Sequence, residues 1–356
     1  MPKPAFLFMI KNISIQEFLS MKAGIVLADV RTPAEFEHAH IPGAVNLPLF
    51  SNEERVLVGT TYKQVSREAA ILLGFDLTGN KWSGFIREAL DLAPDKRIAL
   101  HCWRGGMRSG AMAWALDLYG FEVFLIQGGY KSYRQWANQQ FAREYQLLVL
   151  GGMTGSGKTR QLNKLRTLGE QVIDLEELAQ HQGSAYGTMN KMVQPKQEQF
   201  ENDLAWVMKD LDITRRVWLE DENMNIGKVT VPRALWASMI QAPVLNIEVE
   251  TARRVAGLVR EYGALDKDFL ITCTQRIHKR LGPLQTKQAI EAIQQDRMED
   301  FIRIVLVYYD KAYLKALART EPGRIHTLPL AGDSLDEEVR QILDFAKTIK
   351  THSVQS

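Results

Sequence analysis

The sequence contains only two cysteines among 356 residues, at positions 102 and 273. Two cysteines cannot form the disulfide framework of a small secreted domain, so we expect a reducing environment. No pair of cysteines or histidines has the spacing of zinc ligands, and we therefore expect no zinc site.

Long apolar runs and a charge imbalance are also missing. The first ten residues hold a short apolar run without a small-residue cleavage site, and no later stretch approaches the roughly 18 apolar residues of a membrane span. The net charge of +2 neither requires nor excludes a nucleic-acid partner. With 46% apolar and 24% charged residues, the sequence predicts a globular, cytoplasmic protein with no membrane contact, long enough for two domains.

The most informative stretch is the loop of residues 102–108, between an expected strand at 97–102 and an expected helix at 109–119. Two glycines and two arginines stand beside its cysteine. Backbone N–H groups and guanidinium charges aimed at one sulfur favour the thiolate, and such loops lower a thiol pKa from about 8.5. We expect a nucleophile in an anion-binding loop made of Cys102, Arg104, Gly105, Gly106 and Arg108. Cys273 lacks such surroundings and is expected to be structural.

Short apolar strands alternate with helix starts in the first 140 residues. Besides 97–102, residues 25–30 and 123–126 predict strands, and Thr32-Pro33 predicts a helix start with a cap and a first-turn proline. This alternation predicts a parallel α/β sheet with Cys102 at the carboxyl end of a strand, where ligands bind in such sheets.

Several separated segments of this half, in the expected order, resemble the rhodanese family. They are Asp29-Val30-Arg31, Glu35-Phe36, His40-Ile41-Pro42-Gly43-Ala44, the Cys102 loop and Gly128-Gly129-Tyr130. The resemblance implies that the cysteine carries a persulfide or a related chalcogen.

The spacing within the loop leaves a second chemistry open. Five residues separate Cys102 from Arg108, which is the spacing of cysteine phosphatases, including those built on the rhodanese fold. Simple thiosulfate sulfurtransferases usually have one residue fewer. The longer loop indicates a bulkier oxyanion, such as a phosphate ester or a chalcogen-phosphate, without deciding whether phosphorus or its substituent is attacked.

A second phosphate-binding motif occupies residues 152–159, which fit G-x-x-x-x-G-K-[ST] between an expected strand at 146–150 and an expected helix at 160–168. Its glycines let backbone N–H groups surround a phosphate, Lys158 supplies a charge, and Thr159 offers its hydroxyl to Mg²⁺. The expected binding residues are Gly152, Met153, Thr154, Gly155, Ser156, Gly157, Lys158, Thr159, Asp174 and Glu220.

The two acids follow the next expected strands. Asp174 would face an acceptor group, and Glu220, with the acids after it, would hold Mg²⁺ through water. The alternative for both is an ordinary N-cap or sheet-end carboxylate.

Three further segments carry expectations. Residues 182–187 are rich in turn formers and suit closure on a substrate. Residues 284–318 predict one long helix with a buried apolar stripe. Residues 251–280 hold a basic cluster that either follows a phosphate backbone or forms a solvated helix face: Arg253, Arg254, Arg260, Lys267, Arg276, Lys279 and Arg280.

The combination of motifs resembles the bacterial tRNA 2-selenouridine synthases over nearly the whole chain. The ordered segments are residues 102–109, 151–159, 174–176, 181–187 and 220–227. The resemblance implies a rhodanese-like domain over residues 1–140 and a P-loop NTPase-like α/β domain over residues 141–356.

The resemblance also implies two linked reactions on the wobble uridine of tRNA. Geranyl diphosphate alkylates the sulfur of 2-thiouridine, and selenium from selenophosphate then replaces the geranylated sulfur. The P-loop would bind the diphosphate with Mg²⁺. The Cys102 loop would bind selenophosphate, with Arg104 and Arg108 on its oxygens, and take the selenium. Expected partners are tRNA, the small phosphates and the enzyme that supplies selenophosphate.

Two other functions remain as alternatives at this point. One is a rhodanese-fold cysteine phosphatase fused to a small-molecule kinase. The other is a non-catalytic, nucleotide-gated RNA-binding module in which Cys102 has no chemical role.

Overall fold

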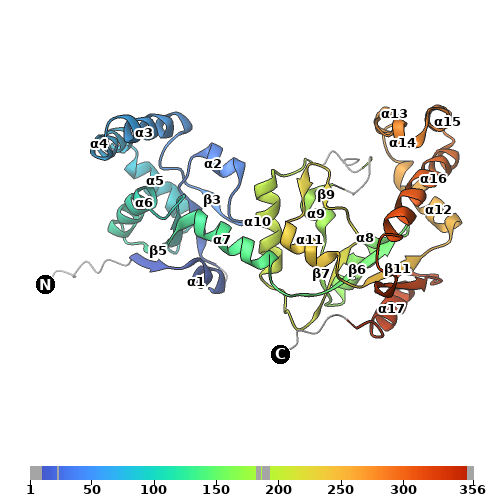
Figure 1. Cartoon of the computed structure of the whole chain (residues 1–356). Helices are drawn as coiled ribbons and strands as arrows, with labels where there is room; N and C mark the ends of the chain where they lie inside the picture. The colour runs from blue at the N-terminus through green and yellow to red at the C-terminus, as the bar shows by residue number, and fades with distance from the viewer. Residues whose placement is uncertain (1–9, 22–23, 182–185, 187–192, 351–356) are drawn as a thin grey trace. The chain divides into compact units, whose positions relative to one another are not determined.

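The computed structural model describes residues 10–21, 24–181, 186 and 193–350 (Figure 1). Backbone contacts divide the chain into two compact units. The first comprises residues 1–140 together with 201–206, and the second comprises residues 141–200 and 207–356. Within the described ranges, no helix is both long enough and apolar enough to cross a bilayer.

The first unit is built on five parallel strands in the order β1-β5-β4-β2-β3. The strands are β1 (Ile10–Ile13), β2 (Val26–Asp29), β3 (Val45–Asn46), β4 (Arg97–His101) and β5 (Glu122–Ile126). The strands expected at 25–30, 97–102 and 123–126 are thus present as β2, β4 and β5. Parallel pairing confirms the predicted α/β class for this unit.

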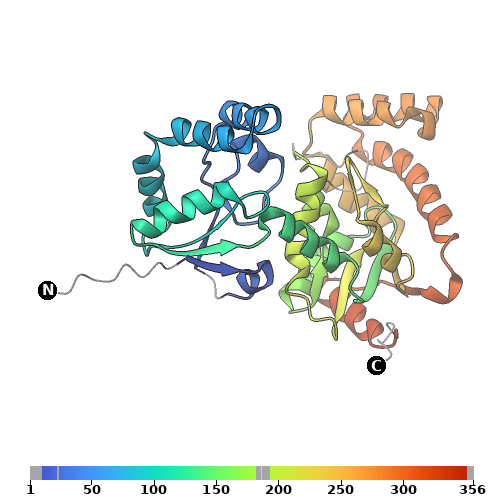
Figure 2. The ribbon, with the colours of Figure 1, turned by 60° about the vertical axis from the view of Figure 1, so that its left-hand side comes forward.

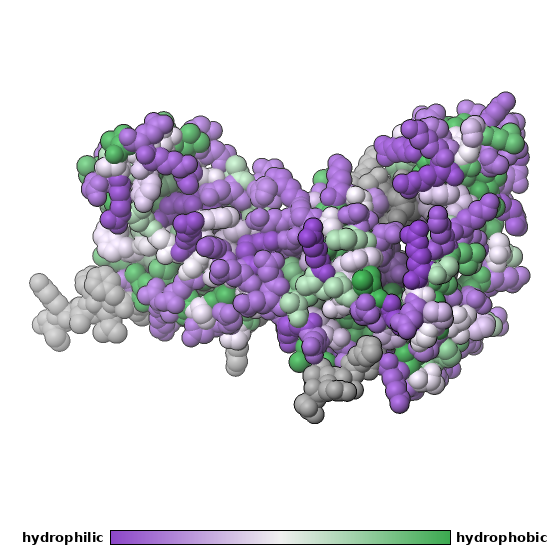
Figure 3. Space-filling model, viewed as in Figure 1, coloured by the Kyte–Doolittle hydropathy of each residue, from purple (hydrophilic) through white to green (hydrophobic). Residues whose placement is uncertain are grey.

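Among the described residues of this unit, these strands are connected by α1 (Ile15–Ser20), α2 (Pro33–His38), α3 (Asn52–Gln64), α4 (Arg67–Thr78), α5 (Trp82–Leu92) and α6 (Met107–Leu118), and α7 (Gly129–Phe141) follows β5. The predicted start of α2 is confirmed, because Thr32 and Glu35 cap each other's backbone N–H groups. The core packs strands β2, β4 and β5 against α5 and α6, and Cys102 lies in it. On α3 and α4, Val56, Leu57, Leu72 and Phe75 are exposed, and Figure 3 shows hydrophobic residues at this part of the surface.

The second unit contains five parallel strands in the order β12-β11-β6-β8-β7. They are β6 (Gln146–Gly152), β7 (Gln171–Ile173), β8 (Arg216–Glu220), β11 (Val244–Glu248) and β12 (Ile325–Pro329). A two-stranded hairpin, β9 (Asn225–Ile226) and β10 (Val229–Thr230), follows β8. The register pairs Leu150 of β6 with Glu220 of β8, so the P-loop and the acid at the end of β8 leave the sheet side by side.

The helices of this unit are α8 (Lys158–Thr167), α9 (Leu175–Ala179), α11 (Arg233–Met239), α12 (Thr251–Tyr262), α13 (Lys267–Arg276), α14 (His278–Leu281), α15 (Pro283–Gln294), α16 (Met298–Leu317) and α17 (Leu335–Ala346), with a 3-10 turn at Pro322–Arg324. The helix α10 (Gln197–Met208) is divided between the units, because its residues 201–206 are assigned to the first. One core packs the sheet against α8 and α17. A second core packs the helices from α12 through α16 against one another.

The single long helix expected over residues 284–318 is wrong. The segment forms α15 and α16, which pack against each other (Figures 1 and 2). The break is at Asp296, whose φ of 58° is left-handed. The backbone N–H of Arg297 then bonds back to the carbonyl of Ala292 at 2.8 Å, which closes the end of α15. Aspartate is one of the few residues that adopt this conformation, so the chain turns at Asp296. The apolar residues before and after this turn belong to the same core.

Candidate active sites

Cys102 follows strand β4 directly, where the chain turns toward α6. The residue is 4% exposed and packs against the apolar core. Its sulfur accepts two hydrogen bonds of 3.2 Å, one from the backbone N–H of Gly106 and one from the hydroxyl of Ser109. The sulfur therefore lies at the beginning of a helix, among donors that stabilise a negative charge.

The pKa of Cys102 reflects two opposing effects. Burial raises the pKa of the thiol, but hydrogen bonds from Ser109, Gly106 and Arg104 outweigh burial, and the net pKa lies below the ordinary value. Cys273 differs, because burial raises the pKa of its thiol. The two cysteines are therefore chemically distinct, and Cys102 is the better nucleophile.

Arg108 differs from the expectation that its guanidinium points at the sulfur. It binds the carboxylate of Glu35, with Nη1 2.6 Å from Oε2 and Nη2 3.3 Å from Oε1. Burial raises the pKa of Glu35, but the pair with Arg108 outweighs it and the net pKa is lowered. Arg104 lies exposed at the surface of the loop. The groups that stabilise the thiolate most are thus a hydroxyl and backbone N–H groups.

Two glycines make the close packing of this loop feasible. Gly105 has a φ of 63°, and a Cβ there would lie 2.8 Å from the carbonyl oxygen of Ile126. Gly129 has a φ of 56°, and a Cβ there would overlap the carbonyl oxygen of Cys102. That same carbonyl accepts the N–H of Tyr130 at 2.8 Å. The Cys102 loop is therefore fixed to the first turn of α7.

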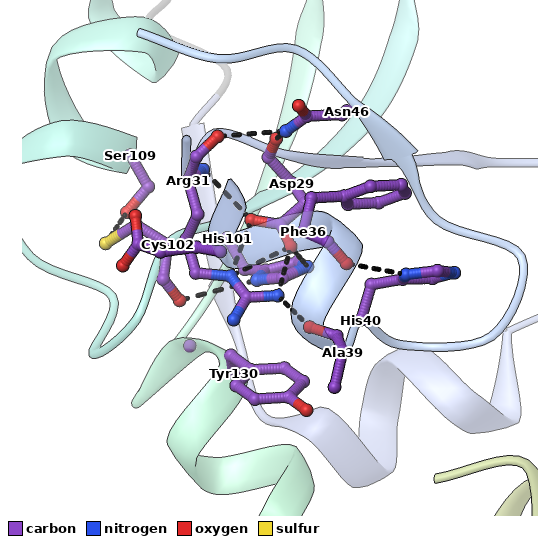
Figure 4. Close-up of polar contacts among 12 residues, drawn as sticks. Asp29, Arg31, Phe36, Ala39, His40, Asn46, His101, Cys102, Ser109 and Tyr130 are labelled. Carbon is purple, nitrogen blue, oxygen red and sulfur yellow. Dashed lines mark hydrogen bonds and ion pairs between the residues drawn. The ribbon is translucent and has the colours of Figure 1, made fainter. Parts of the chain in front are cut away.

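A buried ion pair between Arg31 and Asp29 lies beside the Cys102 loop (Figure 4). Arg31 donates to the carboxylate of Asp29, with Nε–Oδ1 of 3.0 Å and Nη2–Oδ2 of 2.6 Å. The guanidinium centre lies 3.9 Å from the ring centroid of Tyr130. His101 lies 3.8 Å from Asp29, and burial lowers its pKa, so it is held neutral. The Asp29-Val30-Arg31 motif thus forms the scaffold under Cys102.

The P-loop connects β6 to α8, as the motif predicts. Gly152, Gly155 and Gly157 all have positive φ values, of 157°, 80° and 85°. Within the loop, the N–H of Ser156 donates to the carbonyl of Met153 at 3.0 Å. The carbonyl of Thr154 accepts from Arg254, which also binds Asp310 through both guanidinium nitrogens. The loop conformation is therefore fixed both internally and by α12.

Lys158 lies among acids, of which Glu220 is buried. Its Nζ donates to the carbonyl of Gly152 at 3.0 Å and lies 3.5 Å from Oε1 of Glu220. The hydroxyl of Thr159 donates to the other oxygen of Glu220, also at 3.5 Å. Burial lowers the pKa of Lys158, but the surrounding carboxylates outweigh it and the net pKa is raised. Lys158 therefore stays charged.

Glu176, Glu220 and Glu222 meet at this point, with ligand oxygens that all lie within 4.8 Å of one another. Burial, reinforced by the neighbouring carboxylates, raises the pKa of Glu176 to about 10 and that of Glu222 to about 7. Together with the Thr159 hydroxyl they form a set of hard oxygen donors, which Mg²⁺ prefers. The residues present fit a divalent cation, whose charge would offset the crowded carboxylates.

Two further predictions for this site concern Asp174 and the segment 182–187. Asp174 caps α9, where its carboxylate accepts the N–H of Glu177 at 2.8 Å, and burial raises its pKa. Most of the segment 182–187 falls outside the described residues. Its Tyr186 is fully buried, and its hydroxyl lies 2.9 Å from that of Thr274.

The sequence did not single out three residues that the structure places at these sites: Ser109, Glu176 and Glu35. Ser109 had a signal, because it follows Arg108 directly in the motif, and Glu176 lies within a segment that carries the family resemblance. The pairing of Glu35 with Arg108 had none, since 73 residues separate them. Glu222 is one of the acids after Glu220 that the sequence indicated for Mg²⁺.

Comparison with known protein families matches the two halves of the chain to two different families. Residues 14–135 match the family described as "Rhodanese-like domain". Residues 145–341 match the family described as "tRNA 2-selenouridine synthase AAA domain".

Three similar proteins share one name. The tRNA 2-selenouridine synthase of Nitrosomonas europaea is 38% identical over 289 residues, which cover 77% of this chain and 72% of that protein. The synthase of Pseudomonas putida is 31% identical over 367 residues, covering 90% and 93% respectively. That of Cronobacter sakazakii is 40% identical over 249 residues, covering 67% and 65%. The chain therefore belongs to the tRNA 2-selenouridine synthase family and is an enzyme that forms 2-selenouridine in tRNA.

Proposed function

We propose that this enzyme modifies the wobble uridine in two steps, each using one of the two anion-binding sites. The first is geranylation of the 2-thiouridine sulfur by geranyl diphosphate at the P-loop. The second is replacement of that sulfur by selenium from selenophosphate at the Cys102 loop. The observation that carries this proposal is the presence of both a stabilised thiolate and a P-loop lysine in one chain. We place both steps in the cytoplasm, with an encounter with the enzyme that supplies selenophosphate.

The P-loop suits a step in which diphosphate leaves. The 2-thio sulfur forms a bond to carbon 1 of the geranyl group, the carbon–oxygen bond breaks, and diphosphate departs with the electron pair, while the proton on nitrogen 3 of the base passes to water. Lys158 and the loop N–H groups would stabilise the growing charge on the phosphate oxygens. Thr159 and Glu220 would hold Mg²⁺, which neutralises phosphate charge when bound. Binding phosphate oxygens requires no nucleotide hydrolysis.

The Cys102 loop suits the selenium step. Gly105, Gly106 and the arginines Arg104 and Arg108 would bind the oxygens of selenophosphate. The Cys102 thiolate would attack phosphorus and break the phosphorus–selenium bond, so that selenium leaves with the electron pair as selenide and displaces geranyl thiolate from carbon 2 of the base. Water would then release phosphate from the Cys102 sulfur. Alkylation has already converted the base sulfur into a thiol leaving group. Overall, the geranylated base, selenophosphate and water give the selenouridine, geranyl thiol and phosphate. Geranylation therefore comes first, because it creates the leaving group that selenium displaces.

For the tRNA backbone we propose a basic surface on α13 and α14. Several cations in the sequence cluster of residues 251–280 are already paired: Arg253 with Glu338, Arg254 with Asp310 and Lys267 with Asp296. Arg276, Lys279 and Arg280 are exposed, and strongly hydrophilic residues gather in this part of the surface (Figure 3). Exposed lysine and arginine side chains are the groups that bind nucleic-acid phosphates.

A step-resolved reaction tests the division of labour. An RNA hairpin carrying 2-thiouridine is incubated with geranyl diphosphate, Mg²⁺ and selenophosphate, and its nucleosides are identified by mass spectrometry. With Cys102→Ser we expect the geranylated base to accumulate. With Lys158→Met we expect unmodified 2-thiouridine, and a hairpin that is already geranylated should still be converted to selenouridine. Conversion of that hairpin by Cys102→Ser would contradict the proposal.

A further inference from the structure

A partly exposed tryptophan stands beside the nucleophile. Trp103 follows Cys102 in the chain and is 39% exposed. Its carbonyl accepts the N–H of Lys131 at 3.0 Å, next to the bond between Tyr130 and Cys102. The backbone of both loop residues is therefore fixed to α7.

Partial exposure of one tryptophan is common. The residues that pack against this indole are therefore better evidence for a binding role than its exposure alone. The ring of Tyr130 lies 5.6 Å from the Trp103 ring, and the guanidinium of Arg31 lies 5.9 Å from it. Tyr130 and Arg31 are both fully buried, and Asp29 holds Arg31 in place (Figure 4). A buried cation and a buried aromatic ring thus lie against the indole, and 39% of the residue is open to solvent.

The reaction requires a flat surface at this position. Carbon 2 of the target base must reach the reagent at Cys102, which a base stacked within an RNA loop cannot do. Proteins capture such unstacked bases on aromatic side chains. Contacts to phosphates alone would position the RNA but would not hold the base.

We propose that the exposed side of Trp103 is the stacking platform for the target 2-thiouridine base during selenium transfer. This rests on the proposed role of Cys102. The rival occupant of the same surface is the geranyl chain. A flat ring fixed from behind favours a flat partner, whereas a flexible chain would be satisfied by any apolar side chain. Trp103 is accordingly a positioning residue for the base.

A binding cycle on the full-length protein tests the platform. Two RNA hairpins are compared, one with 2-thiouridine and one with an abasic nucleotide at the same position. We expect the wild type to prefer the hairpin with the base by about tenfold, the size of one aromatic stacking contact. Trp103→Phe should keep most of this preference. Trp103→Leu, which keeps apolar bulk without an aromatic face, should abolish it.

Matched controls separate the outcomes. Trp114→Leu, at a tryptophan of α6 that is 52% exposed, should leave the preference unchanged. The alkylation rate of Cys102 reports whether each variant keeps the loop folded. A preference that survives Trp103→Leu would overturn the proposal. So would a Trp103→Ala variant that loses only its extra affinity for a geranylated hairpin, because the indole would then contact the prenyl chain.

The same RNAs separate this proposal from that of the active site. Cys102→Ser should keep the preference for the base while losing selenium transfer. If Cys102→Ser still transfers selenium, the proposed role of Cys102 is wrong. The proposed role of Trp103 is tested separately, by the preference of the Trp103 variants for the hairpin that carries the base.

Discussion

Arg108 and Glu35 form a two-point ion pair at the mouth of the Cys102 loop, with nitrogen–oxygen distances of 2.6 and 3.3 Å. An oxyanion that enters the loop thus meets an arginine already bound to a carboxylate. The anion must either share this guanidinium or displace Glu35 from it. Glu35 therefore limits how strongly the loop holds an anion.

The first prediction follows from that competition. Glu35→Gln removes the charge but keeps an oxygen that can cap the N–H of Thr32, so we expect phosphate to bind the loop about fivefold more tightly, which corresponds to about 1 kcal/mol of relieved repulsion. The measurement is protection of Cys102 from iodoacetamide by inorganic phosphate. Glu37→Gln, an exposed acid on the same helix, should change nothing. Unchanged protection in Glu35→Gln would show that Glu35 does not compete with the anion.

The second prediction concerns pH. Because the pKa of Cys102 is lowered, its thiolate persists to lower pH, and its alkylation rate should reach half-maximum below the ordinary value for a thiol. Ser109→Ala removes one hydrogen bond to the thiolate and should raise that midpoint by about one pH unit. Peptide mass spectrometry separates the label on Cys102 from that on Cys273, whose raised pKa predicts slow reaction. Equal midpoints for wild type and Ser109→Ala would exclude this role of the hydroxyl.

The third prediction tests the packing of the loop. Gly129→Ala places a methyl group against the carbonyl oxygen of Cys102 at a positive φ, and we expect a loss of about 3 kcal/mol or more of unfolding free energy. Gly110, inside α6, has nothing within 4 Å of a built Cβ, so Gly110→Ala should be stabilising by about 0.5–1 kcal/mol. Chemical denaturation measures both. Similar stabilities for the two variants would contradict the described contact.

The fourth prediction concerns the basic surface. Replacing Arg276, Lys279 or Arg280 by alanine should weaken tRNA binding and lower the slope of log affinity against log salt by about one per lost phosphate contact. Lys267→Ala is the control, because Lys267 is paired with Asp296 at 2.6 Å. Filter binding across a salt series measures the slopes. A larger effect from Lys267 than from the other three would place the RNA elsewhere.

Features encoded by neighbouring residues could be predicted from the sequence. The strand before Cys102 and the P-loop each depend on residues within about ten positions, through buried apolar runs, caps and glycines. The capping pair of Thr32 and Glu35 is of the same kind. Local chemistry determined these features, and the structure contains them.

Features that depend on distant residues could not be predicted. The pair of Glu35 with Arg108 and the meeting of Glu176 with Glu220 and Glu222 arise only when separate elements converge. The turn at Asp296 interrupts an apolar stripe whose helical period continues on both sides, so periodicity alone indicated one helix. Tertiary packing decided the first two, whereas the break between α15 and α16 is a local left-handed turn at Asp296 that the apolar period does not reveal.

The central claim is that Cys102 acts after the P-loop step. The most direct test is nucleoside mass spectrometry of tRNA from a deletion strain that expresses the Cys102→Ser variant. We predict that 2-selenouridine is absent and that geranylated 2-thiouridine accumulates, while Cys273→Ser restores normal 2-selenouridine. Normal 2-selenouridine in the Cys102→Ser strain would contradict the account.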